Sequence, residues 1–414
     1  MNHGLNAEEQ IKELLYSMVG EDFVFHSPLL AENSGKKIEL TDFLVLLDDV
    51  LISMQSKSID IDIEDINEIK IGRIFRKYEN AKSQLNRTLN SANRGEKVIL
   101  TANHLNDQIE LPWSNFKHKI IIVTLNIPDN LYSDPEYRFQ FIKYEEYKGI
   151  SLHTFVLQDL VRMVDEIKSG GDLLQYLETR KLLSKIIIQP ATNELDIMAL
   201  YKTNYPFIEE ELINGKVDKF IIAPGSWEAY QETKSKYIQE RDEKIGKLTI
   251  IDSLIKDNRA SISFSIEKYG YSKNEMIAHY LRIIGILNSL STVERYIVEQ
   301  MLKEKYDLSD QAPIRYFIYP FRSKAIFFLV SNESDREIRK KLSLVIAEQA
   351  TLHLQKTMPD VETLLCIVTE GRKIPGRSFD TTLLNVQEIA ALVKELPEKL
   401  FKNKDKGRVD EWSI

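Results

Sequence analysis

Apolar positions over roughly the first 190 residues form short continuous runs that alternate with helical spacing, and this alternation is typical of an α/β domain. The predicted elements, in chain order, are a helix near 7–19, strands at 23–25, 41–47 and 50–57, a helix near 73–93, a strand at 119–125, and helices near 156–168 and 171–184. The first six of these give the order helix, three strands, helix, strand.

The rest of the chain follows a different pattern. An apolar run ends at Pro190, and a proline in that position favours a break between elements. We therefore predict a domain at 1–188 and a C-terminal region at 189–414, mostly helical over 191–310 and α/β over 311–400. Within that region, a hairpin, a helix and a strand at 314–368 repeat the order of the N-terminal elements.

Composition and charge limit the classes of protein to which the chain can belong. With 43% hydrophobic and 29% charged residues among 414, the chain has the composition of an ordinary globular protein. The net charge of −8 argues against broad, non-specific binding of nucleic acid. Residues 66–97 nevertheless carry eight Lys or Arg against three Glu, a local net charge of +5 (8 − 3).

Location is predicted from the same composition. No run approaches the roughly 18 apolar residues of a membrane span, and the acidic, amphipathic N-terminus differs from a signal peptide. We expect a cytoplasmic protein without membrane contact. Its single cysteine, Cys366, lies in an apolar run, which favours a buried residue over a catalytic thiol.

The two apolar strands at 41–47 and 50–57 bring three polar side chains together. If Asp48 and Asp49 form a two-residue turn, paired positions sum to 97 and Asp42 lies directly opposite Gln55 on one face of the sheet. Lys57 lies two residues further along and shares that face. Core packing does not require such a group, although a surface hairpin that happens to end in polar residues is the simpler alternative.

A carboxylate, an amide and an amine at one strand end suit phosphodiester hydrolysis, which needs a hard cation held by oxygen ligands. Asp42 would supply the anionic ligand to Mg²⁺. Gln55, through its side-chain oxygen, and Ser56, through its backbone carbonyl, would supply neutral ligands. Lys57 would orient or deprotonate the attacking water and offset charge in the transition state.

These residues and the order of elements around them resemble the PD-(D/E)XK, or restriction-endonuclease-like, nuclease superfamily. The motif is Asp42, twelve intervening residues and Gln55-Ser56-Lys57, and its Gln is similar to the variant in Mrr-type nucleases. The resemblance covers about residues 1–130 and implies an α-β-β-β-α-β nuclease core. It also implies an endodeoxyribonuclease that uses Mg²⁺ or Mn²⁺, cuts DNA and serves in bacterial restriction or anti-phage defence.

The family carries an acidic residue on its first helix, and the helix near 7–19 offers three glutamates. Its apolar face consists of four residues, Ile11, Leu14, Leu15 and Met18. Glu8 lies at the edge of that face, whereas Glu9 and Glu13 point largely away from it. We favour Glu8 in a supporting role at the metal site, with Glu9 as the alternative and Glu13 behind both.

The helix near 73–93 carries a polar stripe beside its apolar face. Because a polar residue on this helix faces the active site in related nucleases, we predict that Gln84 does so here. Three basic residues of the stripe are predicted to contact the phosphate backbone, namely Lys77, Arg87 and Arg73. A solvated helix face is the alternative for these basic residues.

Two other classes of protein fit parts of the sequence. One is a non-catalytic nucleic-acid-binding module that keeps the nuclease fold. The other is a sensor or interaction subunit, active through its C-terminal region and working with a partner ATPase or as a homo-oligomer. The chain itself has no Walker A motif, so we expect no nucleotide-driven motor in it.

Overall fold

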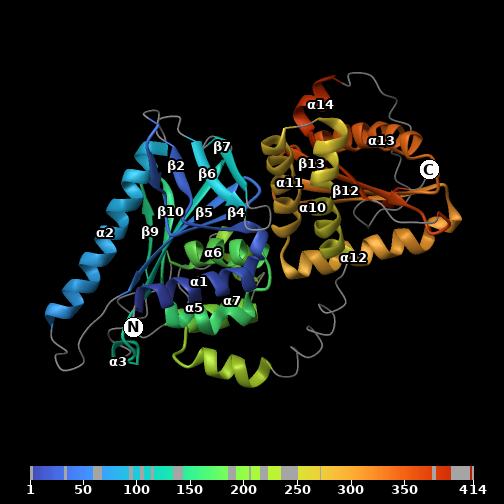
Figure 1. Ribbon diagram of the computed structural model, residues 1–414. Helices are drawn as coiled ribbons and strands as arrows, with labels where there is room; N and C mark the ends of the chain where they lie inside the picture. The colour runs from blue at the N-terminus through green and yellow to red at the C-terminus, as the bar shows by residue number, and fades with distance from the viewer. Residues whose placement is uncertain are drawn as a thin grey trace. The chain divides into compact units, whose positions relative to one another are not determined.

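A computed structural model describes the protein as a mixed α/β chain, which confirms the predicted class at that level (Figure 1). The described residues are 3–31, 35–58, 68–92, 97–102, 107–112, 116–133, 143–184, 193–204, 207–214, 222–234, 250–270, 272–374, 379–392 and 411–412. Within these ranges, no single helix combines the length and apolarity needed to cross a membrane.

The chain divides into two compact units. Unit 1 consists of Met1–Glu243 and Lys273–Thr292, and unit 2 consists of Lys244–Ser272 and Val293–Ile414. This division differs from the boundary predicted at residue 188, because segments after that residue pack into unit 1. The reason is tertiary contact: helices that follow residue 188, such as the helix Glu194–Asn204, belong to the core of unit 1.

Unit 1 is built on a six-stranded central sheet with the strand order β1-β4-β5-β8-β10-β9. The strands are β1 (Val24–His26), β4 (Phe43–Leu47), β5 (Val50–Ser58), β8 (His118–Asn126), β9 (Lys143–Tyr147) and β10 (Ile150–Val156). β4 and β5 form an antiparallel hairpin, and β5, β8 and β10 run parallel to one another. Two long helices pack on this sheet: α1 (His3–Val19) on β1 and β5, and α2 (Glu68–Ala92) on β5 and β8.

The sequence did not predict six strands of unit 1. β9 and β10 extend the central sheet, and the other four form a separate side sheet in the order β3-β2-β6-β7. The side-sheet strands are β2 (Leu29–Ala31), β3 (Lys37–Glu39), β6 (Lys97–Ala102) and β7 (Asp107–Pro112). β2 and β3 are only three residues long, too short for an alternating pattern to distinguish them from a loop.

A buried charged cluster ties the helices that follow β10 to the central sheet. Arg180 on α6 (Gly170–Leu183) forms an ion pair with Glu194 on α7 (Glu194–Asn204), with 2.8 Å between Nε and Oε1. The same guanidinium donates to the Thr154 carbonyl and lies 3.2 Å from Nδ1 of His153. Burial, together with the Arg180 charge, holds the pKa of His153 well below its usual range. This cluster places α7 in unit 1.

Helix α11 (Lys273–Asn288) also belongs to unit 1 although it follows α10 (Ile250–Tyr269) of unit 2 in the chain. The Asn288 side chain donates to the Val19 carbonyl at 2.6 Å. Gly285 lies so close to the hairpin turn that an added Cβ would be 2.5 Å from the Asp48 backbone nitrogen. The β4–β5 hairpin is therefore supported at its turn by a helix that is distant in sequence.

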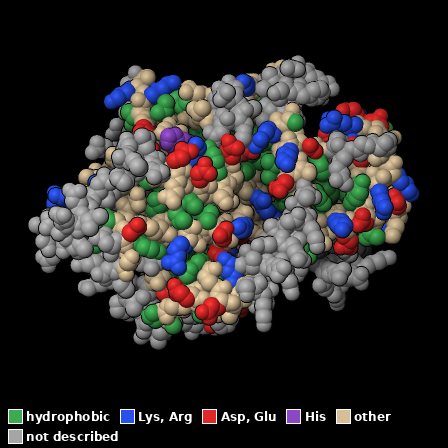
Figure 2. Space-filling model, turned by 60° about the horizontal axis from the view of Figure 1, so that its bottom comes forward, with side chains coloured by type: hydrophobic (Ala, Val, Ile, Leu, Met, Phe, Trp, Pro, Cys, Tyr) green, Lys and Arg blue, Asp and Glu red, His purple; other side chains and the backbone are tan. Residues whose placement is uncertain are grey.

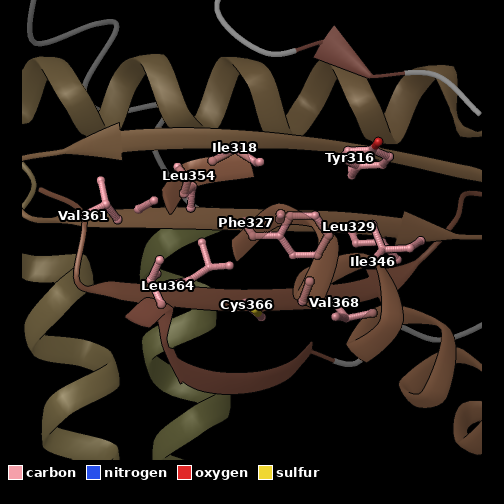
Figure 3. Close-up of a cluster of buried hydrophobic side chains, with 14 residues drawn as sticks. Tyr316, Ile318, Phe327, Leu329, Ile346, Leu354, Val361, Leu364, Cys366 and Val368 are labelled. Atoms are coloured by element: carbon pink, nitrogen blue, oxygen red, sulfur yellow. The ribbon is translucent and has the colours of Figure 1, made fainter. Parts of the chain in front are cut away.

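Unit 2 contains a five-stranded sheet in the order β14-β13-β12-β11-β15. Its described elements are α10, α12 (Thr292–Asp307), β11 (Ile314–Phe321), β12 (Lys324–Ser331), α13 (Arg336–Thr357), β13 (Thr363–Glu370), β14 (Phe379–Asn385), α14 (Val386–Leu392) and β15 (Glu411–Trp412). α13 packs its buried face on β12 and β13, and the core between them is shown in Figure 3. Cys366 is 5% exposed in this core, and burial raises the pKa of its thiol, which confirms the predicted buried role.

Unit 2 repeats the local topology of unit 1. In each unit an antiparallel hairpin with a two-residue turn is followed by a long helix and then by a strand parallel to the second hairpin strand. In unit 1, β6 and β7 lie between that helix and that strand in the chain. Both turns begin with a residue of positive φ, Asp48 at 59° and Arg322 at 49°. Counted from the turns, the positions that match Asp42, Gln55 and Lys57 hold Tyr316, Leu329 and Ser331. Unit 2 thus has no equivalent of that polar set.

Candidate functional site

The β4–β5 hairpin has the predicted register, from Leu47 opposite Val50 to Phe43 opposite Met54. Asp42 lies one residue before β4, and its carboxylate joins the two strands. The Gln55 side-chain amide donates to one carboxylate oxygen at 2.5 Å, and the Ser56 backbone N–H donates to the other at 2.6 Å. The two-residue turn and the period of the strands therefore bring Asp42, Gln55 and Ser56 together as the sequence predicts.

Neighbouring backbone contacts hold Asp42 in place. The Thr41 hydroxyl, on a side chain that is 2% exposed, donates to the Met54 carbonyl at 2.7 Å. On the other side, the Ser27 backbone N–H donates to the Asp42 carbonyl at 2.8 Å. The carboxylate is thus fixed between β1 and β5 before any ligand arrives.

The Asp42 carboxyl group has a raised pKa, and burial is the largest cause. The Ser56 N–H and the Lys57 charge act in the opposite direction, whereas the charges of Glu8 and Glu39 raise it further. Partial burial and the two neighbouring carboxylates therefore disfavour the charged form of Asp42, and a cation bound at this carboxylate would offset that cost.

Lys57 lies half-buried on β5, two residues beyond Gln55. Strand alternation places both side chains on the same face of the sheet, and the Lys57 charge acts on Asp42. Among the described residues, no acceptor is within hydrogen-bonding distance of the Lys57 ammonium. Its charge is therefore close to Asp42 while its three donors remain available to a ligand.

Helix α1 has the predicted phase. Ile11, Leu15 and Met18 are buried, and Leu14 is partly so. The Glu8 side chain is 39% exposed, with its carboxylate 3.9 Å from Nε2 of His26 on β1. The Glu9 side chain is 61% exposed and pairs with Lys12 at 3.0 Å. Of the two, Glu8 lies on the side that faces Asp42.

On the polar stripe of α2, Lys77 contacts the end of the strand that carries Gln55 and Lys57, whereas the predicted role of Gln84 stays a prediction. Lys77 donates a hydrogen bond to the carbonyl of Ser58, the last residue of β5. Gln84 is exposed and lies seven residues further along the helix, about 10 Å away at 1.5 Å per residue. Arg73 is also exposed, and the side chain of Arg87 lies outside the described residues. The apolar face has the predicted phase, since Ile74, Tyr78, Ala81 and Leu85 are buried.

Comparisons with models of protein families, with curated proteins and with solved structures find no match to this chain.

Asp42 and its neighbours could hold a cation whose remaining ligands come from the substrate. The described part of the chain has no group of three or more His, Cys, Asp or Glu side chains that could hold a metal. Asp42 instead offers one carboxylate whose oxygens each accept a single hydrogen bond, which leaves lone pairs free. Mg²⁺ is commonly held by one or two carboxylates together with substrate phosphates, so this set fits that ion.

The neutral ligands fit as well. In an extended strand the N–H and C=O of one residue point to the same side, so the Ser56 carbonyl faces the Asp42 side of β5 along with its N–H. The Gln55 side-chain nitrogen donates to Asp42, so the Gln55 side-chain oxygen takes no part in that hydrogen bond. The Ser56 carbonyl therefore lies on the side of β5 that faces Asp42, and the Gln55 oxygen belongs to the amide group that donates to Asp42.

The sequence did not identify three polar residues as neighbours of the site, namely Thr41, His26 and Glu39. Glu39 ends β3, a strand that was not predicted, and its charge contributes to the raised pKa of Asp42. His26 comes close through the antiparallel pairing of β1 with β4, in which it lies opposite Phe43. Three polar residues at strand ends, each within 16 positions of Asp42, were the available signal.

Proposed function

We propose that unit 1 is a metal-dependent endonuclease of the PD-(D/E)XK type that hydrolyses DNA with Mg²⁺ or Mn²⁺. The observation that carries the proposal is the half-buried Asp42 carboxylate, which is hydrogen-bonded to Gln55 and Ser56. It lies beside the Lys57 ammonium, which has no hydrogen-bond acceptor among the residues that the structure describes. The order α1, β1, β4, β5, α2, β8 supports the proposal because it matches the core expected of that superfamily.

Asp42, the Gln55 oxygen and the Ser56 carbonyl would hold the cation, and Glu8 would act from the edge of the site. When bound, the cation supplies charge that polarises the phosphate and lowers the pKa of water. Lys57 orients the attacking water and stabilises the negative charge that develops on the phosphate oxygens. The new bond would form between the water oxygen and phosphorus as the bond from phosphorus to the leaving sugar oxygen breaks. The proton lost by the water passes to solvent, and the leaving sugar oxygen takes up a proton from solvent to become a hydroxyl group.

Contact with nucleic acid is expected to be local. On the face shown in Figure 2, acidic and basic side chains of the described residues are interspersed, without a broad patch of one sign. Basic residues other than Lys57 lie in the first half of α2, where Arg73 and Arg76 are exposed and Lys77 contacts the end of β5. A few phosphate contacts at this point would position one strand against Asp42.

A cleavage assay tests the proposal. Supercoiled plasmid, single-stranded DNA and RNA are incubated with the full chain, with Mg²⁺ and with EDTA. We expect nicking or linearisation of the plasmid only with Mg²⁺. Metal-independent binding without cleavage would favour a non-catalytic module instead, and cleavage restricted to RNA would overturn the proposed substrate. A role in bacterial restriction or anti-phage defence belongs to the same proposal and would follow from cleavage of foreign DNA.

A further inference from the structure

Helix α13 of unit 2 presents an apolar outer stripe. Ile338, Leu344 and Val345 are 52%, 44% and 49% exposed, although the opposite face of the same helix is buried on the sheet. Of the eight large hydrophobic side chains that are exposed in the described ranges, these three lie on one helix within eight residues. Exposed apolar side chains gathered in this way are typical of an interaction surface.

Two charged residues flank the centre of this stripe. Lys341 precedes Leu344 by one turn, and Glu348 follows Val345 by one turn. Neither forms an ion pair with any residue that the structure describes. From Lys341 to Glu348 the order is positive, apolar, apolar and negative. These four positions are symmetric about the midpoint between Leu344 and Val345 and carry opposite charges at the two ends, whereas Ile338 lies outside this symmetric part.

We propose that α13 pairs with the α13 helix of a second copy of this chain in an antiparallel contact about a two-fold axis. In that arrangement Leu344 packs against the partner's Val345, and Lys341 lies opposite the partner's Glu348. Each contact occurs twice, as a symmetric interface requires. A parallel arrangement would instead place like charges together and is disfavoured.

This self-complementarity is what selects a second copy over another partner. An unrelated helix would need an independent match to both charges, whereas a copy of α13 supplies the match by symmetry. With 22 residues, α13 is about 33 Å long, so the apolar centre occupies only part of it. Because the contact is small, we expect a monomer–dimer equilibrium that depends on concentration.

Sedimentation of the full chain over a range of concentrations tests the pairing. We expect dimers in the unmodified protein. Lys341→Glu and Glu348→Lys should each raise the dimer dissociation constant more than about tenfold, because each places like charges opposite one another. The double variant, Lys341→Glu with Glu348→Lys, restores the opposite charges and should restore the dimer. Its recovery would also show that neither substitution unfolds the chain.

Lys303→Glu is the matched control, because it makes the same charge change at an exposed lysine of α12 in the same unit. It should leave the dimer unchanged. An unmodified protein that stays monomeric at every concentration would overturn the proposal. A dimer that is indifferent to the single reversals, or one that the double reversal fails to restore, would also overturn it.

Discussion

The Asp42 carboxylate is held in an environment that disfavours its charge. Its pKa is raised mainly by burial, and the charges of Glu8 and Glu39 add to that effect. Between the unfolded-state pKa and this raised folded-state pKa, the folded protein binds the proton more tightly. The contribution of Asp42 to stability therefore rises as the pH falls through that interval and is unfavourable above it.

Replacing the charge should therefore stabilise the protein without metal. We expect Asp42→Asn to melt at a higher temperature than the unmodified chain at mildly alkaline pH, in the presence of EDTA. The difference should shrink as the pH is lowered, because protonation neutralises Asp42 in the unmodified chain. Thermal melts from mildly alkaline to mildly acidic pH, with EDTA present, measure the difference in melting temperature. A variant that is less stable at every pH would show that the carboxylate is not under electrostatic strain.

A substitution at Lys57 distinguishes a catalytic role of this residue from a role in binding DNA. Lys57→Met keeps much of the apolar stem and removes the charge and the donors. If Lys57 acts on the attacking water, single-turnover cleavage should fall by about 10²–10⁴-fold while DNA affinity in Ca²⁺ changes little. Weaker, less salt-sensitive binding with normal turnover at saturation would identify a phosphate contact instead.

The same substitution can be made at two neighbouring glutamates of α1, with Glu8 as the test position and Glu9 as the control. Glu8→Gln removes a charge that acts on Asp42, and we expect cleavage to fall by about 10–100-fold, as for other residues that support metal ligands. Glu9→Gln removes an exposed partner of Lys12 and should leave cleavage unchanged. Cleavage rates under identical Mg²⁺ concentrations compare the two. Equal losses would mean that helix phase does not decide which glutamate takes part.

Among the elements, the β4–β5 hairpin determines the geometry of the site. α11 supports its turn, where Gly285 leaves no room for a side chain against the Asp48 backbone. Gly285→Ala should destabilise unit 1 by about 1–3 kcal/mol, the usual cost of overpacking a tight contact. Urea unfolding followed by circular dichroism measures this loss.

Gly72 provides the control for that substitution. It lies within α2, and an added Cβ would meet nothing within 4 Å. Gly72→Ala should therefore stabilise the helix by up to about 1 kcal/mol, because alanine has the higher helix propensity. If both substitutions had the same effect on stability, close packing of α11 against the turn would be refuted.

The hairpin also shows why part of the site was predictable. A two-residue turn fixes the register, and alternation fixes the face, so the positions of Asp42, Gln55 and Lys57 follow from local sequence. The phases of α1 and α2 follow from apolar spacing in the same way. Glu39 and His26 could not be placed, because β3 is too short for a pattern and the β1–β4 pairing depends on contacts distant in sequence. The role of Gln84 stays a prediction, because helical phase does not say how far along a helix the site lies.

For the whole molecule, the division into units was the least predictable feature. Unit 1 includes α7 and α11, which follow residue 188 in the chain. α7 is held through the buried pair of Glu194 with Arg180, and α11 through contacts with the hairpin turn and with Val19. These contacts join residues that are far apart in the sequence, so the local pattern of apolar and polar residues does not predict them. The repeated topology of unit 2 was visible in its sequence because hairpin, helix and strand are each local.

Cleavage of DNA by the intact chain tests the central claim most directly. The unmodified protein, Asp42→Asn and Asp49→Asn are compared on plasmid DNA with Mg²⁺, because Asp49 lies in the turn at the opposite end of the same hairpin. We expect the unmodified protein and Asp49→Asn to cleave at similar rates. Asp42→Asn should be folded and inactive. Undiminished cleavage by a folded Asp42→Asn protein, or no Mg²⁺-dependent cleavage by the unmodified chain, would contradict the account.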